Sequence, residues 1–298
     1  MSKKLQASLM LGLAGCSYGL FLTLMKIANM NGYMRDDLMV GQYLSAAVIL
    51  GILVVAKYRV KVRLVQVLRL GIVGVFGFAC SFCMYEAVAL TNTSLAVTML
   101  FQYVWMGILI DCVVRKSLPS PRIIAATILV MLGTPFAAGV ISGSGFAMPL
   151  AGFAWGMGAA LTYAGMLVTS SRFETKLPSV VRTFYFSVTE FILAAIFSFG
   201  HVTSSLLDLG AWTFALPIGL VSVVIPCLLI MKGAPQVPMG ITTIMTGLEL
   251  PATIVFAQLI LGKIHVPLEI AGVLVICLGI LVANWDGIRE FRKQTKPA

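Results

Sequence analysis

The chain has 298 residues, of which 59% are hydrophobic and 11% are charged, whereas an average soluble domain carries about 25% charged residues. So little polar surface cannot cover a water-soluble globule. The composition therefore excludes a soluble enzyme, a disordered protein and a nucleic-acid-binding domain, despite the formal net charge of +10. The fold class that remains is an all-α integral membrane protein.

A helix that crosses a membrane needs about 20 mostly apolar residues. Ten stretches meet this requirement and account for most of the chain, which leaves no stretch for a soluble domain. We interpret the first as a retained helix, because its apolar run is longer than that of a signal peptide and more spans follow it. In chain order the ten are Leu5–Ala28, Leu38–Ala56, Val65–Ala89, Thr93–Val114, Pro121–Ile141, Leu150–Ser170, Val181–Phe199, Ala211–Met231, Pro238–Leu261 and Pro267–Asp286.

The basic residues gather in alternate loops. With the N-terminus in the cytoplasm, 18 of the 21 Lys and Arg residues fall on the cytoplasmic side, and only Lys26, Arg35 and Lys263 fall outside. The positive-inside rule then places both termini in the cytoplasm, which requires an even number of spans. Orientation and contact with lipid headgroups thus explain the net charge without a nucleic-acid partner.

The two halves of the chain align at a nearly constant offset of 145 to 147 residues. Tyr18 matches Tyr163, Gln102 matches Glu249, and Pro121 matches Pro267. Because each half holds five of the ten spans, the second half must enter the membrane upside down. We predict two inverted five-helix repeats, residues 1–141 and 146–298. Inverted repeats are a recurrent architecture of secondary transporters, whose halves exchange conformations and open a central site to each side in turn.

Three parts of the chain carry a family resemblance. They are Gly15–Gly19 continuing to Lys26, Asn92–Ala96 with Leu100–Trp105, and Glu249–Pro251 with Leu261–Gly262 and Gly272–Ala283. Through them the whole chain resembles the EamA-type ten-helix members of the drug/metabolite transporter superfamily. The resemblance implies two inverted five-helix repeats and the export or import of small metabolites, in many members the export of amino acids or related compounds. Relatives usually have Leu-Gly-Glu where this chain ends its ninth span with Leu-Gly-Lys263, so no role of that Glu is carried over.

Two glutamates lie at the midpoints of predicted spans, Glu190 in the seventh and Glu249 in the ninth. Ionisable groups inside a bilayer cost about 2.5–3.5 kcal/mol on insertion scales, so they face the bundle interior or water. Each carboxyl group can load and release a proton, pair with a cationic group of the substrate, or simply donate a hydrogen bond to a neighbouring helix. The sequence leaves these roles open.

Pro251 adds to the case for Glu249. A proline inside a helix removes one backbone hydrogen bond and frees the carbonyl four residues earlier, here that of Gly247. Irregular backbone at the middle of a membrane is tolerated where it lines a cavity. We therefore expect Gly247, Glu249 and Pro251 to contribute to a binding site.

Polar and aromatic residues of other spans are further candidates for the cavity wall. They offer hydrogen bonds or flat surfaces for aromatic and cationic ligands, and structural hydrogen bonding is the alternative interpretation. Lys26 is a weaker candidate that attracts an anionic group or extends to the membrane interface. The full set is Tyr18, Tyr163, Gln102, Tyr103 and Trp105, with Gln42, Tyr43 and Lys26 as the weaker members. The six cysteines all fall inside predicted spans, and we assign them to helix packing.

These features predict a secondary active transporter that exports small organic metabolites by alternating access, with proton coupling as a hypothesis. The alternatives are an uptake permease, a multidrug efflux carrier for lipophilic cations, and a non-transporting membrane scaffold. We expect that the protein is not an enzyme, because no HExxH, GxSxG or Cys/His constellation occurs. We expect no cofactor and no metal, a monomer or weak homodimer, and a multi-pass protein of the cytoplasmic membrane of a bacterium.

Overall fold

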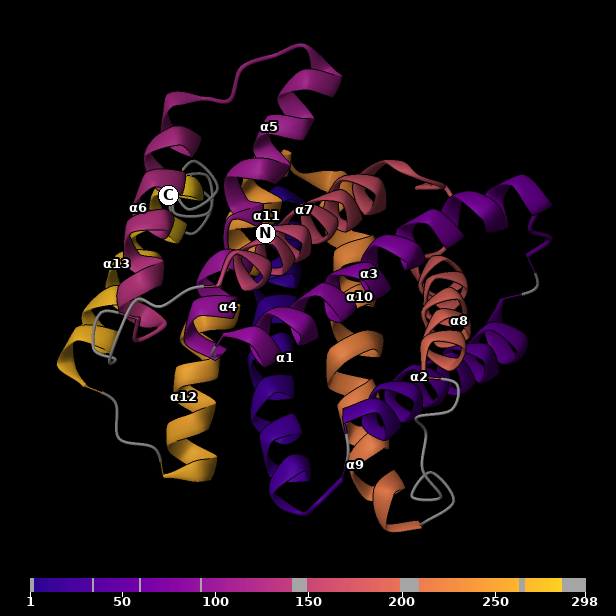
Figure 1. The fold of residues 1–298 in the computed structure, drawn as a ribbon. Helices are drawn as coiled ribbons and strands as arrows, with labels where there is room; N and C mark the ends of the chain where they lie inside the picture. The colour runs from indigo at the N-terminus through magenta and orange to yellow at the C-terminus, as the bar shows by residue number, and fades with distance from the viewer. Residues whose placement is uncertain are drawn as a thin grey trace, which may run out of the picture.

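The computed structural model describes residues 3–33, 35–58, 60–91, 93–140, 149–198, 209–262 and 266–285. All regular structure in these ranges is helical, as the sequence predicts (Figure 1). The predicted Lys263, and the ends of three predicted spans at Ile141, Phe199 and Asp286, lie outside the described residues.

The described residues of the first half of the chain form six helices. They are α1 (Lys3–Met30), α2 (Arg35–Lys57), α3 (Leu64–Leu90), α4 (Thr93–Leu100), α5 (Tyr103–Arg115) and α6 (Pro121–Ala137). The second half forms a similar succession with additional short turns. It comprises α7 (Leu150–Arg172), α8 (Ser179–Phe197), α9 (Leu209–Gly219), the π-helical turn η2 (Leu220–Val224), α10 (Ile225–Gly233), the 3₁₀ turn η3 (Ala234–Gln236), α11 (Met239–Thr246), α12 (Glu249–Leu261) and α13 (Pro267–Ala283).

Each predicted span coincides with one helix or with a run of consecutive helices. Eight of these segments are long and apolar enough to cross a membrane, which supports a multi-pass membrane protein. The other two, α6 and α13, have 17 residues each. At a rise of about 1.5 Å per residue they reach roughly 25 Å, which is shorter than the hydrocarbon core. The fifth span was predicted to run to residue 141, but α6 ends at Ala137, just before Gly139 takes a positive φ of 74°.

Two predicted spans are interrupted helices rather than continuous ones. The fourth span breaks between α4 and α5 at residues 101–102, and the ninth breaks between α11 and α12 at residues 247–248. At the second break the Gly247 amide donates to the Ile244 carbonyl and the Leu248 amide to the Met245 carbonyl, each at 3.2 Å. These three-residue-spaced bonds are typical of a tight 3₁₀-like turn. The two breaks are 146 residues apart, which equals the offset between the halves of the sequence.

The helix packing follows one pattern in both halves. Helix α1 packs against α10 and against α11 and α12, whereas α7 packs against α3 and against α4 and α5. Figure 1 shows α6 beside α13 at one edge of the bundle and α2 beside α8 at the other. If each helix is replaced by its counterpart in the other half (α1 by α7, α3 by α10, and α4 and α5 by α11 and α12), the same helix pairs result.

Glycines allow the closest of these contacts. A Cβ atom at Gly15 of α1 would lie 2.5 Å from the Thr246 carbonyl oxygen, and one at Gly19 would lie 2.7 Å from the Ala252 Cβ. Helix α1 therefore lies directly against the backbone of the α11–α12 break, as small residues permit in membrane helices. This contact fixes the position of Glu249.

Candidate functional site

A cavity of about 770 Å³ lies in the centre of the helix bundle. Its lining begins at Tyr18 of α1 and Gly77 of α3 and extends to Asn29, Ala89 and Leu261, near the C-terminal ends of α1, α3 and α12. Within the described chain, no residue of the first two turns of α1 or α3 lines it. The cavity therefore runs from the middle of the bundle to one end, which the charge pattern predicts to be the outer end.

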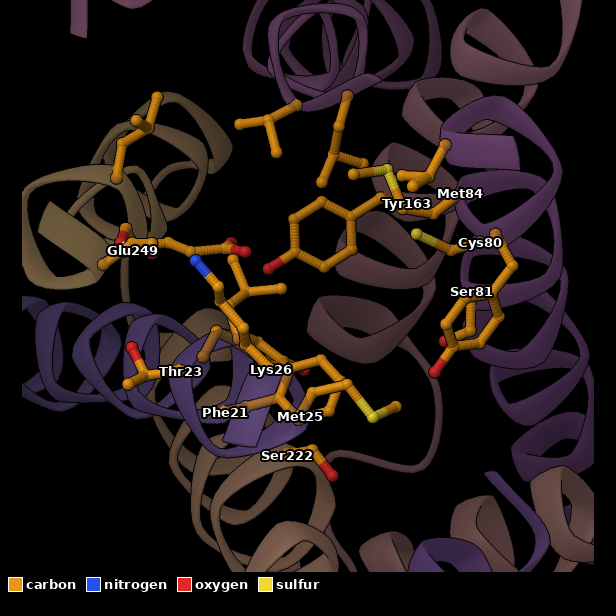
Figure 2. A pocket seen from close by; sticks show the side chains of 18 of the residues that line it. Phe21, Thr23, Met25, Lys26, Cys80, Ser81, Met84, Tyr163, Ser222 and Glu249 are labelled. Carbon is orange, nitrogen blue, oxygen red and sulfur yellow. The ribbon is translucent and has the colours of Figure 1, made fainter. Parts of the chain in front are cut away.

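Glu249 lies at the inner part of this cavity as the first residue of α12, directly after the helix break. Its side chain is partly exposed to the cavity. Its backbone carbonyl accepts a hydrogen bond from Thr253 Oγ1 at 2.8 Å and would lie 2.8 Å from a Cβ at Gly19. Figure 2 shows the carboxyl group directed into the space between the helices, on the side toward which Lys26 extends.

Glu190 also lines the cavity but is held differently. It lies near the middle of α8, and its side chain is only 4% exposed. Its Oε2 atom is buried and finds no hydrogen-bond partner among the described residues. A buried polar atom without a partner is costly, so the protein keeps this carboxyl group for a reason other than internal hydrogen bonding.

Three tyrosines connect the cavity wall to the interior of the bundle. The rings of Tyr18 and Tyr163, which the repeat alignment pairs, meet edge to face with centroids 6.3 Å apart. Behind them Tyr103 meets Tyr163 at 4.5 Å. The Tyr163 hydroxyl, drawn pointing into the cavity in Figure 2, is without a protein partner in the described part of the chain. The Tyr18 hydroxyl lies 3.6 Å from the Cys227 Sγ.

The weaker candidates of the first two spans all reach the cavity. Lys26 lies toward the outer end, and Gln42 and Tyr43 form part of the wall on α2. The Tyr43 hydroxyl donates to Ser81 Oγ at 2.9 Å, whereas Gln42 Oε1 is buried without a partner in the described structure.

The fourth-span candidates do not line the cavity. Tyr103 is fully buried, and its hydroxyl lies 3.2 Å from the Thr243 carbonyl and 3.1 Å from Thr246 Oγ1. Trp105 is 37% exposed and donates its Nε1–H to Gln102 Oε1 at 2.9 Å. The break at residues 101–102 accounts for this difference, because Leu100 and Phe101, which precede α5, occupy the cavity wall instead.

Gly247 and Pro251 support the cavity from behind rather than line it. The Gly247 carbonyl accepts a hydrogen bond from the Leu250 amide at 3.4 Å, so the tight turn uses the carbonyl that Pro251 was expected to free. Both residues shape the break that presents Glu249.

Sequence reasoning missed the cavity face of α3. Gly77, Cys80, Ser81 and Met84 all line the cavity, and their spacing of three, four and seven residues places them on one helix face. This spacing was the available signal. Cys80 and Cys227 thus lie at the site, although the sequence assigned the cysteines to packing alone. In the described ranges no group of three or more His, Cys, Asp or Glu side chains is arranged to hold a metal ion.

The opposite end of the bundle is closed by polar contacts between the two halves. Asp111 Oδ1 of α5 accepts from Arg115 Nε, four residues later on the same helix, at 2.9 Å, and also from Arg172 Nη2 of α7 at 2.6 Å. The second contact was not predicted, because its partners are 61 residues apart.

Glu174, in the turn between α7 and α8, makes a second set of such contacts. It accepts from Gln66 Nε2 at 2.7 Å and from Arg69 Nη1 at 3.1 Å, both on α3. The Gln66 hydrogen bond, followed by the Arg69 hydrogen bond and charge, lowers the pKa of Glu174 below its ordinary value of 4.5. Next to it, Arg182 of α8 is buried and donates to the carbonyl groups of Ser170 and Met231, at the C-terminal ends of α7 and α10.

Comparison with known proteins agrees with this fold. Residues 150–285 match the model of the EamA-like transporter family, which supports the resemblance for the second half of the chain. A solved crystal structure, titled only as that of a protein, superimposes with a TM-score of 0.79. It is 19% identical, and the match covers 95% of this chain and 99% of the other, so this likeness concerns the fold alone. No curated protein matches the sequence.

Proposed function

We propose that this chain, whose residues 150–285 belong to the EamA-like transporter family, is a secondary transporter that exports small organic metabolites. The observation that carries the proposal is the central cavity, which is open toward one end of the bundle and holds the carboxyl groups of Glu190 and Glu249, with a third, Glu269, contributed by the first turn of α13. A membrane transporter needs a substrate site with access to one side at a time, and this cavity has that form.

Alternating access is supported by the relation between the halves. The matched breaks at residues 101–102 and 247–248, and the helix pairs that persist when the halves are exchanged, are consistent with two inverted five-helix repeats. In such repeats each half can adopt the conformation of the other. We therefore propose ten spans with both termini in the cytoplasm, in which the described conformation is open to the outside.

The walls favour a substrate with a cationic group and an apolar body. Carboxyl groups supply the anionic part of the cavity, and Phe21, Tyr163 and Phe186 supply aromatic surface. Amino acids and related amines have this combination, and Lys26 toward the mouth can attract a carboxylate. Proton antiport supplies the driving force in this proposal, since a carboxyl group can exchange a proton for a cationic substrate.

The alternative substrate class is a lipophilic cation. The same aromatic and carboxyl groups bind a quaternary cation through its charge and its apolar surface. The two classes differ in their need for Lys26, which only a substrate with a carboxylate requires.

A ligand screen on detergent-purified protein tests the proposal. Amino acids, nucleosides, purines, organic acids and lipophilic cations are added at about pH 5.5 and about pH 7.5, because a bound ligand raises the melting temperature by mass action. A hit should be lost in Glu249→Gln and kept in Glu86→Gln, a control carboxyl of α3 that does not line the cavity. Uptake of the hit into inside-out vesicles, driven by an acidic interior, then tests export. A ligand whose shift of the melting temperature is unchanged in both Glu249→Gln and Glu190→Gln would contradict the assigned site.

A further inference from the structure

We infer that Glu249 and Glu190 have different roles in the cavity, in which Glu249 stays ionised and binds the cationic group of the substrate while Glu190 carries the exchanged proton. This inference rests on the proposed function, because it assigns the steps of proton-coupled export to single residues. It differs from a scheme in which proton and substrate compete for one carboxylate.

The position of Glu249 suits a permanent anion. It is the first residue of the 13-residue helix α12, and its carboxyl group is directed to the side toward which Lys26 extends (Figure 2), where a positive charge favours the ionised form. Its side chain is partly exposed to the cavity, so water or ligand reaches it. The nearby Tyr163 hydroxyl, unpartnered within the described protein, is available to donate to a carboxylate or a ligand.

The position of Glu190 suits a proton carrier. It lies within α8 away from either terminus, is almost completely buried, and has an oxygen atom with no partner in the described chain. An ion without a partner is strongly disfavoured in such surroundings, whereas a neutral carboxyl group is tolerated.

The groups that face Glu190 from other helices are uncharged in their ordinary states. They are Tyr18 of α1, Tyr43 of α2, Cys80 of α3 and Cys227 of α10, each of which feels the charge of Glu190. None is basic, and among the described residues no Lys or Arg side chain forms an ion pair with Glu190. The one basic side chain that lines the described cavity, Lys26, extends on the side of Glu249 (Figure 2), so a cationic substrate in the cavity supplies the positive charge that ionised Glu190 needs.

The charge of the cavity is then the same in both loaded states. With the proton bound, Glu190 is neutral and Glu249 contributes one negative charge. With the cationic substrate bound, both carboxylates are ionised and the substrate cancels one of them. Substrate arriving from the inside releases the proton from Glu190 to the cytoplasm, and a proton entering from the outside onto a Glu190 oxygen displaces the substrate. One proton is exchanged for one positive charge, and no other reactant is needed.

Binding of tetraphenylphosphonium and of phenethylammonium to the full-length protein, measured between about pH 5 and about pH 8, tests the assignment. One competing proton weakens cation binding by up to about tenfold for each unit of pH decrease. Wild type, Glu86→Gln and Glu190→Asp should show this dependence, and Glu190→Gln should bind with a Kd independent of pH. Glu249→Gln should bind about tenfold or more weakly at every pH, because a charge-assisted contact is lost, but keep the pH dependence.

A pH dependence that survives in Glu190→Gln, or that disappears in Glu249→Gln alone, would overturn the assignment. If wild type binds neither cation, the proposed function fails for cationic substrates. The pH dependence of the melting temperature without ligand then tests whether Glu190 takes up and releases a proton. Ionisation of Glu190 should lower the melting temperature of wild type as the pH rises, and Glu190→Gln should remove this change while Glu249→Gln keeps it. Identical profiles of wild type and Glu190→Gln would overturn the assignment in that case also.

Discussion

Gly77 of α3 lies directly against the carboxyl group of Glu190 of α8, since a Cβ atom at position 77 would be 2.6 Å from Glu190 Oε1. The same Cβ would be 2.7 Å from the ring of Phe186, one turn earlier on α8. The absence of a side chain at Gly77 thus sets the position of a buried carboxyl group at the cavity. Glu190 and the packing of α3 on α8 cannot change independently of each other.

Gly77→Ala should destabilise the protein and disturb the proton site together. The added methyl group must displace Glu190 or separate the helices, and overpacking of this kind costs about 1–3 kcal/mol. Thermal unfolding in detergent and the pH dependence of cation binding measure the two effects. Gly71→Ala is the matched control on the same helix, because its Cβ would make an ordinary 3.5 Å contact with Thr189 Oγ1. Equal stability of the two variants would contradict the tight contact at Gly77.

Two tyrosine substitutions should separate a structural hydroxyl group from a binding one. Tyr103→Phe removes the contacts to Thr243 and Thr246 and should lower the free energy of unfolding by about 1 kcal/mol, with ligand binding retained. Tyr163→Phe removes a hydroxyl group that has no described protein partner, so stability should hold while ligand binding weakens. Thermal unfolding and ligand titration of both variants check this, and the reverse pattern would place the binding hydroxyl on α5.

The sequence predicted the helices well because apolar length and charge asymmetry are local properties. Gly247 and Pro251 predicted irregular backbone in the ninth span, but the sequence predicted neither the break in the fourth span nor which residues then turn toward the cavity. Gln102, at the break before α5, and Trp105 of α5 are therefore hydrogen-bonded to each other outside the cavity, although the second-half counterpart of Gln102 is Glu249, which lines it. Glu190 and Glu249 reach the cavity as expected, because a carboxyl group inside a membrane bundle has few other places to lie.

Contacts between segments that are distant along the chain also could not be predicted from the sequence. Asp111 and Arg115 are four residues apart on one helix, but Arg172 and Glu174 gain their partners only when α7 packs against α3 and α5. The position of Cys80 at the cavity could not be predicted without the orientation of α3. Residue spacing places Cys80 and Gly77 on one face of this helix, but only the structure shows that this face points toward the centre.

Glu174 should make the stability of the protein depend on acidic pH. Its pKa is lower in the folded protein than the ordinary value of 4.5, so its contribution is fully present above that value. The contribution is lost as the pH falls from about 4.5 through the lower, folded-state pKa, when the carboxylate takes up a proton. Thermal unfolding of wild type and Glu174→Gln across this range measures the effect. The curve of Glu174→Gln should be flatter, and parallel curves would show that the contacts of Gln66 and Arg69 do not depend on the charge.

Arg172 should hold the inner end of the bundle closed, whereas Arg115 should not. Both contact Asp111 Oδ1, but Arg115 belongs to α5 itself, while Arg172 joins α5 of the first half to α7 of the second. Loss of a contact made only in the outward-open state shifts the population toward the inward-open state, and a loss of about 0.7 kcal/mol already changes the ratio roughly threefold. Alkylation of Cys80, as the single remaining cysteine, by a membrane-impermeant maleimide added outside reports this population. Arg172→Gln should slow labelling about threefold or more, and Arg115→Gln should label like wild type. Equal effects of the two variants would mean that the Asp111 cluster stabilises α5 alone, and labelling of wild type only from the cytoplasmic side would reverse the assigned orientation of the cavity.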